Sequence, residues 1–406
     1  MAVSSNIFNN VVDITAAALD SVKNNCKMAS RVARRWDGDF KGSQKIGDTM
    51  NIRIPGFYNY RSGAGANPSG YNDSYIPVVL AQGGAEILLT SKELTLNLDD
   101  FKKNVVEPLM APVFQKIDKS LADQTKNFNQ FYGTVGTAIT TTKPFLDAKA
   151  VMATQSAVPQ DGKLSGLLNE YMQASMVSGM AAVFNPTKEI SDQYRTGSIG
   201  SFGEIDFFAT ANAPTLVLGT WSGSVTVDAG PADGGNALTL AGQTGSYAVG
   251  ECFTIAGVLA VNPQGKDTCA ELKQFTVVTS SNGNITVSPA CYLTGPLQNV
   301  SKLPANGDAI YMWGQSAGTA LAAGTGQIVK TSAVFHEDAI ALAIGDIVDV
   351  SGFGGASSTR MKDDQSGLRC RSLFWYNGMD DSALFRIDVL FGSSPLRLGY
   401  GSRVIS

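Results

Sequence analysis

The sequence predicts an α+β fold, and two patterns carry that prediction. Apolar residues recur at four-residue steps from Val105 to Leu121, the spacing of one face of a long helix. From about residue 215 to 313 the composition changes to Gly, Thr, Ser and Val in short alternating runs, which is typical of strands. The 406 residues suggest two or three domains, or one large elaborated domain, and 44% hydrophobic residues are enough to bury a substantial core.

Residues 1–47 are predicted to form an N-terminal arm. Within them, residues 6–35 have the amphipathic spacing of a helix, set by Ile7, Val11, Ile14, Ala18 and Val22. A helix of this length gains its stability mainly from packing, and no second helix follows for it to pack on. We therefore expect the arm to lie on a neighbouring chain or domain.

Residues 48–98 are predicted to form an extended loop. Ile52 and Ile54 alternate with polar residues in a strand that stops at Pro55-Gly56. A Gly, Asn, Pro and Tyr-rich excursion over 57–75 follows, and a strand-like return runs through Ile87, Leu89, Leu94, Leu96 and Leu98. Long excursions of this kind are usually functional or disordered. The pattern indicates an extended hairpin that needs a partner surface.

Residues 99–214 are predicted to begin with a long helix. Asp99 and Asp100 supply cap chemistry for a helix over 99–131. Pro108 and Pro112 lie inside that stretch, and each removes a backbone donor, so we expect the helix to bend there. A second helix is predicted over 164–178.

Residues 215–313 are predicted to be an inserted antiparallel β-domain or barrel. The turn signals Gly234-Gly235 and Asn282-Gly283 separate its runs, which lie at 224–227, 237–240, 252–255, 275–278 and 285–287. In residues 314–406 we expect a helical piece around 337–344 and strands at 346–350, 371–376 and 385–391.

The charge balance argues against a protein that binds nucleic acid directly. The net charge is −4 and only 16% of residues are charged, below the roughly 25% of average domains. Low charge favours a surface kept dry by repeated subunit contacts, although a secreted β-rich protein could show the same balance. The basic cluster of Arg31, Arg34 and Arg35 is a solvated or ion-paired helix end, or else an assembly contact or an inward-facing charge.

The cysteines and the apolar runs indicate the cellular compartment in which the protein is expected. Five widely spread cysteines without a C-x-x-C pair argue against a disulfide framework and a zinc site, and suit a reducing cytoplasm. The N-terminus lacks the pattern of a secretory signal, and no run of about twenty apolar residues predicts a membrane span.

A search for chemistry ends without a catalytic, cofactor-binding or metal-binding residue. Gly314-Gln315-Ser316-Ala317-Gly318 matches a nucleophile elbow after a strand-like 309–313. The glycines that follow argue against the helix this motif requires, and no acid lies between Ser316 and His336, the single histidine. Gly65 and Gly70 have the Walker spacing, but Tyr71 and Asn72 stand where Lys and Ser/Thr are needed.

Two further groups are interpreted as structural. The adjacent pairs Asp99-Asp100, Asp363-Asp364 and Asp380-Asp381 suit caps or turns better than a carboxylate dyad, because strand neighbours point to opposite faces. The aromatic residues Phe57, Tyr58 and Tyr60 could stack bases, but only Arg53 and Arg61 flank them. We therefore favour protein contacts for this cluster.

Three stretches resemble the major capsid proteins of tailed phages, more narrowly the coat proteins of the Salmonella podophage P-twenty-two type. The order of arm, extended loop, long helix and inserted β-domain resembles that family too. The stretches are Val183-Phe184-Asn185-Pro186, then Ile255-Ala256-Gly257-Val258 with the 275–287 hairpin, and Ser366-Gly367-Leu368 leading into 373–378. The chain departs from the family in a short segment between Phe184 and the insertion, and in a compact insertion.

This resemblance implies the Johnson fold (Hong-Kong-ninety-seven-like) and a structural role without catalytic residues or cofactors. It also implies that 99–214 hold the spine helix, the peripheral domain and the first part of the axial domain, and that 314–406 hold the rest of the axial and peripheral domains. It implies an icosahedral head shell of hexamers and pentamers, assembled in the host bacterial cytoplasm with a scaffolding protein and a portal. The packaged DNA would be enclosed without specific binding, and no membrane would be involved. The alternatives are another virion or surface structural protein, such as a tail or adhesin component, and a serine hydrolase built on Ser316.

Overall fold

The structure is a computed structural model, and it describes most but not all of the 406 residues. The described residues are 27–34, 49–54, 56–58, 63–64, 74–90, 107–180, 200–281, 283–351, 356–362 and 369–406. Backbone contacts divide the chain into two compact units. Unit 1 comprises Met1–Arg53, Tyr75–Leu121 and Ile340–Ser394, and unit 2 comprises Ile54–Ser74, Ala122–Ala339 and Pro395–Ser406.

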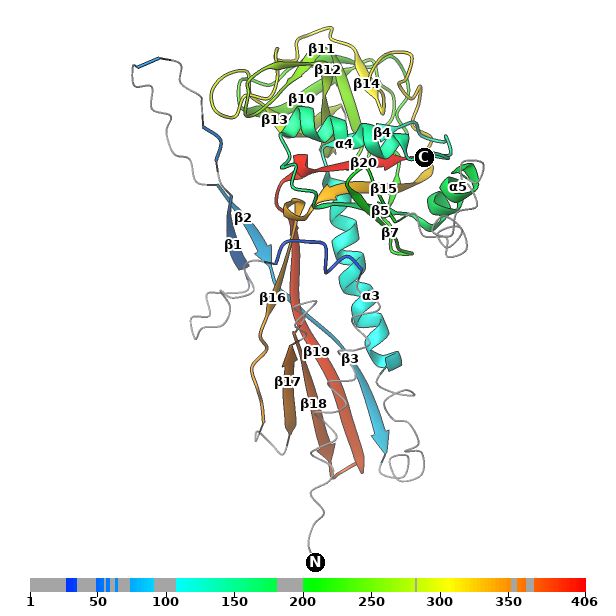
Figure 1. Cartoon of the computed structure of the whole chain (residues 1–406), viewed down its shortest axis with the longest axis vertical. Coiled ribbons are helices and arrows are strands. Elements are labelled where there is room, and N and C mark those ends of the chain that lie inside the picture. Colours follow the sequence, from blue (N-terminus) through cyan, green and yellow to red (C-terminus); the bar gives the residue numbers. More distant parts are fainter. Residues whose placement is uncertain are drawn as a thin grey trace, which may run out of the picture. The chain divides into compact units, whose positions relative to one another are not determined.

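A five-stranded sheet organises unit 1 (Figure 1). Its order is β16 (Ile340–Gly345), β19 (Ser382–Pro395), β18 (Arg369–Asn377) and β17 (Ser357–Lys362), with β3 (Ala81–Thr90) also paired to β19. β19 forms because apolar residues occupy every second position, and Phe385, Ile387 and Val389 are at most 1% exposed. A separate pair joins β1 (Thr49–Ile54) to β2 (Ser74–Val79).

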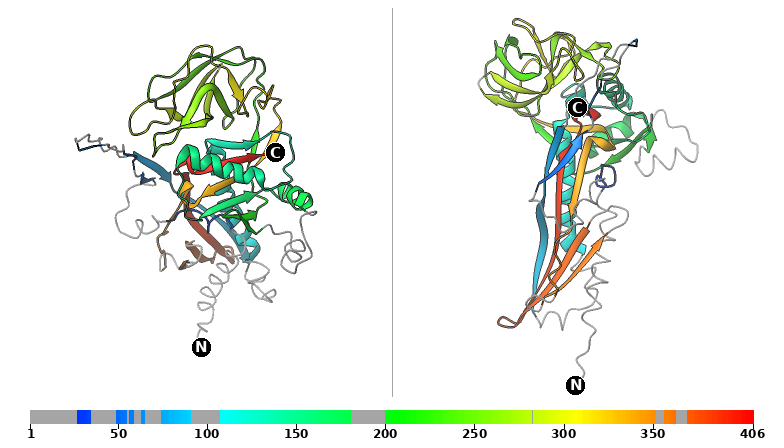
Figure 2. Two further views of the ribbon diagram at one scale, coloured as in Figure 1. Left: turned by 45° about the horizontal axis from the view of Figure 1, so that its top comes forward. Right: turned by 90° about the vertical axis from the view of Figure 1, so that its left-hand side faces the viewer.

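The long helix of unit 1 is α3 (Glu107–Gln124), which lies alongside β3 and β19 in both Figure 1 and Figure 2. Its buried stripe is Met110, Phe114, Ile117 and Leu121, each no more than 1% exposed. Leu109 is only half-buried, so the stripe is shifted by one position from the predicted one at its start. Burial of this stripe is what stabilises the helix.

Unit 2 contains a mixed seven-stranded sheet. The order is β4 (Gln130–Gly133), β20 (Gly401–Ile405), β15 (Ile328–His336), β5 (Leu164–Leu168), β7 (Ile205–Ala209) and β6 (Ser201–Phe202), with β8 (Thr215–Val217) also paired to β15. The pairs β20–β4 and β5–β7 are parallel. The helices α4 (Lys143–Ser156) and α5 (Glu170–Met180) belong to the same unit.

A six-stranded antiparallel sheet completes unit 2. Its order is β14 (Ile310–Met312), β11 (Cys252–Val261), β12 (Thr268–Ser281), β13 (Asn284–Cys291), β10 (Gly235–Ala241) and β9 (Thr226–Ala229). A bridge between Thr226 and Ala309 joins the first strand to the last, so the six strands close on themselves. One continuous apolar core is formed by residues of this closed sheet together with Phe131, Val329 and Ile405 of the seven-stranded sheet.

Most of the predicted strands are confirmed. The alternating runs at 237–240, 252–255, 275–278 and 285–287 lie in β10 to β13, and the run at 224–227 overlaps β9. The turn glycines Gly234 and Gly283 have φ values of +81° and +83°, a backbone region that favours glycine. The strands predicted at 371–376 and 385–391 lie inside β18 and β19.

The predicted helix over 99–131 is too long at its end. α3 stops at Gln124, a 3₁₀ turn follows at 125–127, and Phe128 is extended, because 130–133 are recruited as β4. The two prolines also differ in consequence. Pro108 lies in the first turn, where its missing N–H would have no intrahelical partner, and only Pro112 is inside the helix. Residues 99–106 lie outside the described residues.

Four other predictions are wrong in part. Residues 164–168 of the second predicted helix are strand β5, because pairing to β15 and β7 recruits them, and only 170–180 are helical. Residues 337–344 form a 3₁₀ turn and β16, while 346–350 are irregular. The return strand of the extended loop starts at Ser74, since β2 pairs with β1. Helix α4 was not predicted, and its weakly amphipathic sequence explains why.

The predicted arm lies mostly outside the described residues. Its described part, 27–34, forms a turn and not a helix, and it ends in a bridge from Ala33 to Ala341 of β16. The Asp118 carboxylate of α3 accepts a hydrogen bond of 2.8 Å from the Met28 backbone N–H, which draws this segment onto the helix. No described helix is both long and apolar enough to cross a membrane.

Candidate functional site: the open face of the unit 1 sheet

The side chains of β3, β19 and β18 alternate between a buried face and an open face. The register pairs Leu88 with Leu384 and Leu384 with Trp375, so these three lie side by side on the open face. We call them the apolar row. Leu88 is 63% exposed and Trp375 is 39% exposed. An exposed row of large apolar side chains across three strands is a feature of surfaces that contact another molecule.

A charged ladder lies further along the same face. Glu86 pairs with Arg386, and Asp388 pairs with Arg371, in the register of the three strands. Asp388 is fully buried, and its two carboxylate oxygens each accept a 2.6 Å hydrogen bond, one from Nη2 of Arg371 and one from Nε of Arg386. The bond from Arg371 joins β18 to β19, whereas Arg386 lies on β19 beside Asp388 and holds its other carboxylate oxygen.

Glycine on β3 makes room for that carboxylate. Gly84 lies opposite Asp388, and a Cβ at Gly84 would collide with the backbone oxygen of Ile387 and with Oδ1 of Asp388. A Cβ at the neighbouring Gly83 would meet only Phe391, at 3.8 Å. Lack of space therefore requires glycine at position 84 but not at position 83.

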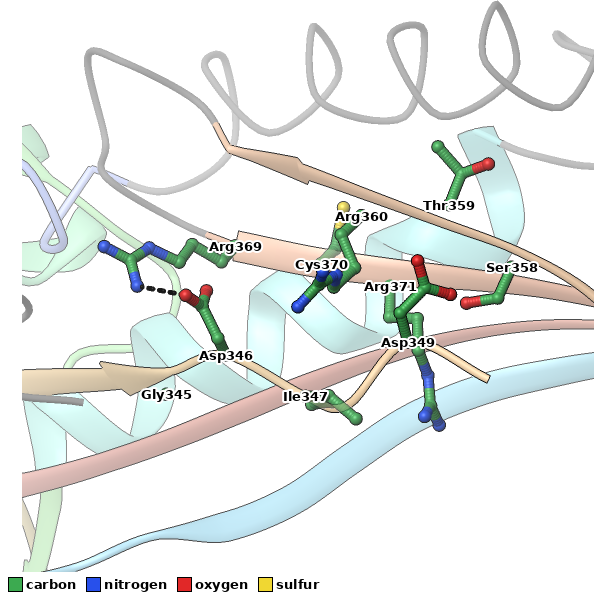
Figure 3. A pocket seen from close by; sticks show the side chains of 10 residues that line it. All are labelled: Gly345, Asp346, Ile347, Asp349, Ser358, Thr359, Arg360, Arg369, Cys370 and Arg371. Atoms are coloured by element: carbon green, nitrogen blue, oxygen red, sulfur yellow. Dashed lines mark ion pairs between the residues drawn. The ribbon is translucent and has the colours of Figure 1, made fainter. Parts of the chain in front are cut away.

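A polar pocket of about 510 Å³ is lined by the strands β17 and β18 and by the segment that follows β16 (Figure 3). Arg369 points toward Asp346, with Nη1 and Oδ2 2.9 Å apart, as Figure 3 shows. Arg360 and Arg371 also line the pocket, together with Asp349. Three guanidinium groups and two carboxylates give a surface that can bind an acidic or polar chain.

The pocket offers little nucleophilic chemistry. Its thiol is Cys370, and burial raises the pKa of that thiol to about 12, so it stays protonated at neutral pH. The described residues contain no group of three or more His, Cys, Asp or Glu side chains placed to hold a metal ion. The arrangement suits recognition of a partner surface.

The β18–β19 hairpin ends in an exposed turn. Met379 at its tip is 95% exposed. Oδ2 of Asp380 accepts a 2.8 Å hydrogen bond from Asn377, and Oδ1 of Asp381 accepts one of 2.6 Å from the Tyr376 hydroxyl. The interpretation of this acidic pair as a turn is confirmed, whereas Asp99-Asp100 and Asp363-Asp364 lie outside the described residues.

The structure does not pair Ser316 with His336. The Ser316 hydroxyl lies 3.3 Å from that of Thr319 in a turn, and no helix follows among the described residues of 314–327. His336 is buried on β15, where Nε2 lies 3.0 Å from the Asp161 carboxylate and Nδ1 accepts a bond from the Asp338 backbone N–H. The nucleophile-elbow motif is a turn.

The basic and aromatic clusters are only partly described. The Arg31 guanidinium donates a 3.1 Å hydrogen bond to the Lys27 backbone oxygen, while Arg35 and Tyr60 lie outside the described residues. The Arg397 guanidinium carbon lies 5.8 Å from the centre of the Phe57 ring, a protein contact of the kind favoured for that aromatic cluster.

Sequence reasoning did not find the residues of the open face as a site. Trp375 lies in 373–378, one of the stretches that resemble the capsid family, and Leu384 lies just before the strand predicted at 385–391. Neither feature reveals which strands are neighbours in the sheet. The alternation of β19 predicts a buried and an open face. Only the register shows that Leu88, almost 300 positions away, completes the row.

No protein-family model and no curated protein matches this chain. A solved structure of Mycobacterium phage Che8 aligns over 93% of this chain and 89% of that chain at 11% identity, with a TM-score of 0.46. The capsid of Ralstonia phage GP4 aligns over 89% and 84% at 8% identity, with a TM-score of 0.41. The CUS-3 coat protein I-domain aligns over 22% of this chain and 96% of its own length at 27% identity, with a TM-score of 0.19. The structures that this chain is similar to thus include a phage capsid and a coat protein domain, while the P-twenty-two-type assignment stays a prediction.

Proposed function

We propose that this chain is the major capsid protein of a tailed phage, a structural subunit that self-assembles into the icosahedral head shell. The observation that carries the proposal is the apolar row of Leu88, Leu384 and Trp375 on the open face of the unit 1 sheet. A subunit that meets many copies of itself gains free energy from such a row at about 25 cal/mol per Å² of apolar surface buried.

The charged groups beside the row suit the same role. Glu86 and Arg386 of the ladder, and the pocket around Arg369, present both signs of charge next to apolar surface. Complementary charges at the rim of an interface set its register and exclude wrong partners more than they add affinity. A shell subunit needs this selectivity because each copy has several neighbours.

The proposal extends to the organisation of the chain. Residues 1–47 would form the arm, 48–98 the extended loop, 99–214 the spine helix with the first peripheral and axial parts, 215–313 the insertion, and 314–406 the remainder. The partners would be further copies in hexamers and pentamers, a scaffolding protein and a portal. The shell would assemble in the bacterial cytoplasm and enclose DNA without specific contacts.

The test compares assembly of the wild type with that of Leu88→Asp and the matched control Gln82→Asp. Both substitutions place one carboxylate at an exposed position on the same face of β3, but only the first interrupts the apolar row. The proteins would be purified alone and with a scaffold-like gene product, then imaged by negative-stain electron microscopy.

We expect closed shells or uniform curved sheets for the wild type and for Gln82→Asp. For Leu88→Asp we expect soluble protein with an unchanged circular dichroism spectrum and at least a tenfold loss of assembled material. A discrete small particle from the wild type under every condition would favour a tail or adhesin component. Equal assembly by both variants would show that the apolar row is not an interface.

A further inference from the structure

An asparagine at the tip of the β18–β19 hairpin is placed to react with its own backbone. Asn377 is the last residue of β18, and Gly378 follows it in the exposed turn. In an Asn-Gly pair the backbone nitrogen of the glycine has no Cβ beside it, so it can approach the asparagine side chain closely. The sequence contains three such pairs, and a second one that the structure describes, Asn306-Gly307, allows a comparison. The third begins at Asn282, which lies outside the described residues.

The side chain of Asn377 is held at both ends of its amide. Its Oδ1 accepts a 3.1 Å hydrogen bond from the Met379 backbone N–H, and its Nδ2 donates one of 2.8 Å to Oδ2 of Asp380. The first bond closes an Asx turn, which folds the side-chain carbonyl toward the peptide of Gly378. The same bond gives a donor to the oxygen that gains negative charge when the carbonyl carbon is attacked. The second bond places a carboxylate beside the nitrogen that has to leave.

The attacking nitrogen, that of Gly378, is not engaged elsewhere. The ladder of β18 and β19 ends where Asn377 pairs with Ser382, and the Gly378 N–H has no acceptor among the described residues. An N–H that donates to nothing in the fold can reach the side-chain carbon without the loss of a hydrogen bond. Asn377 therefore combines a free nucleophile with a carbonyl that is already polarised.

Asn306-Gly307 differs at both points. The Gly307 N–H donates to the Val227 backbone oxygen at 2.8 Å, so this nitrogen is already in use. Oδ1 of Asn306 has no donor among the described residues, while its Nδ2 donates to the Asp228 backbone oxygen at 2.7 Å. Asn306 is exposed and Asn377 is half-buried, so access to water does not favour Asn377. What separates the two sites is the hydrogen bonding of the reacting groups.

We propose that Asn377 is a self-modification site, at which the Gly378 nitrogen attacks Cγ of Asn377 to form a succinimide and release ammonia. The new bond joins that nitrogen to Cγ, the bond from Cγ to Nδ2 breaks, and the proton of the Gly378 N–H leaves with Nδ2 in the ammonia. Water then opens the ring to aspartate or isoaspartate, so the sequence of steps needs no oxidant. The product adds one negative charge beside Asp380, at a tip where Met379 is 95% exposed. The inference is carried by the hairpin and does not depend on the proposed shell function.

The test follows both asparagines in the full wild-type chain during incubation at neutral pH and 37 °C. Peptide mapping by mass spectrometry measures the conversion of each, and an isoaspartyl methyltransferase detects isoaspartate, which arises only through the ring. We expect Asn377 to convert at least about tenfold faster than Asn306, because two hydrogen bonds separate the sites and each is worth about fivefold in rate, or about 1 kcal/mol. In concentrated urea the two rates should agree within about threefold, since both sites are then unfolded Asn-Gly pairs.

Gly378→Ala tests the nucleophile, because the fold has room for it. A Cβ at Gly378 would meet only the Tyr376 ring, at 3.8 Å, yet it would crowd the backbone nitrogen of residue 378. We expect this variant to keep the circular dichroism spectrum of the wild type, to slow the conversion of Asn377 at least fivefold and to leave Asn306 unchanged. An unchanged rate at Asn377 would show that the Gly378 nitrogen is not the nucleophile. The proposal is also overturned if Asn306 converts as fast as Asn377 in the folded chain, if Asn377 converts only in urea, or if its product is aspartate without isoaspartate.

Discussion

At the scale of single residues, Lys273 is a source of instability at neutral pH. Burial lowers its pKa from 10.5 to about 8 in the fold, so between those values the unfolded chain binds more protons than the folded chain. The free energy of unfolding should therefore rise with pH from about 8 to about 10.5. The full effect is about 3 kcal/mol, from 1.36 kcal/mol per pKa unit.

The prediction for Lys273→Met is that this rise disappears and that the protein is more stable than the wild type at pH 7. Urea unfolding at pH 7, 8, 9 and 10 measures it, with Lys302→Met as the control that keeps the rise. A pH dependence in Lys273→Met that parallels the wild type would show that another group titrates.

Glu251 predicts a pH dependence of opposite sign. Burial raises the pKa of this carboxyl above its usual 4.5, although N–H groups of Trp221, Ala248 and Gly219 donate to it at 3.1, 2.9 and 3.0 Å. The folded chain then binds more protons than the unfolded chain above pH 4.5, so stability falls as pH rises through the folded pKa. Glu251→Gln should flatten that fall above pH 4.5. Urea unfolding followed by tryptophan fluorescence measures it, and an unchanged slope contradicts it.

At the scale of elements, β3 depends on one glycine. A Cβ at Gly84 would collide with β19 at Ile387 and Asp388, so Gly84→Ala should separate the strands locally and destabilise the protein by about 1–3 kcal/mol. Gly83→Ala, one position away, meets only Phe391 and should lie within about 0.5 kcal/mol of the wild type. Denaturant unfolding compares the two, and equal costs would mean that glycine flexibility, and not space, matters in β3.

Two buried strands, β5 and β16, show why parts of the sequence predicted to be helical are strands in the structure. Residues 164–168 have the apolar content of a helix face, yet all five are buried in β5 between β15 and β7. A fully buried strand has no polar alternation, so its periodicity does not separate it from a buried helix. The same holds for 340–345, all six of which are buried in β16.

At the scale of the whole molecule, one guanidinium ties the two sheets of unit 2 together. Arg403 on β20 is 1% exposed, donates to the backbone oxygen of Gly250 and to the Thr276 hydroxyl, and contacts the Cys252 sulfur. Its guanidinium carbon lies 5.5 Å from the centre of the Trp313 ring. These partners belong to the six-stranded sheet or its flanks, whereas β20 belongs to the seven-stranded sheet.

Arg403→Ala should therefore destabilise unit 2 by about 3 kcal/mol, because it leaves a cavity and buried acceptors without a donor. Hydrogen exchange should show the strands β11 and β12 losing protection before β5 and β15. Ser402→Ala on the same strand removes a buried hydroxyl without a partner among the described residues, and it should be neutral or slightly stabilising. Uniform loss of protection across both sheets would contradict a linking role for Arg403.

The sequence by itself determined the α+β class, the strands β10 to β13, β18 and β19, and most of the core of α3. These follow from local periodicity, turn glycines and composition, which act over a few residues. The resemblance to capsid proteins is a separate observation, carried by three short stretches and by the order of the segments. The sequence also predicted that Ser316 and His336 do not form a catalytic pair, because the local context around the motif was wrong for it.

Only the tertiary structure decided which strands are neighbours, and with them which side chains share a surface. The apolar row joins Leu88 to Leu384 and Trp375, and the charged ladder joins Asp388 to Arg371. Strand register depends on side chains far apart in the sequence that pack or collide, as Gly84 and Asp388 do, and no local pattern contains that information.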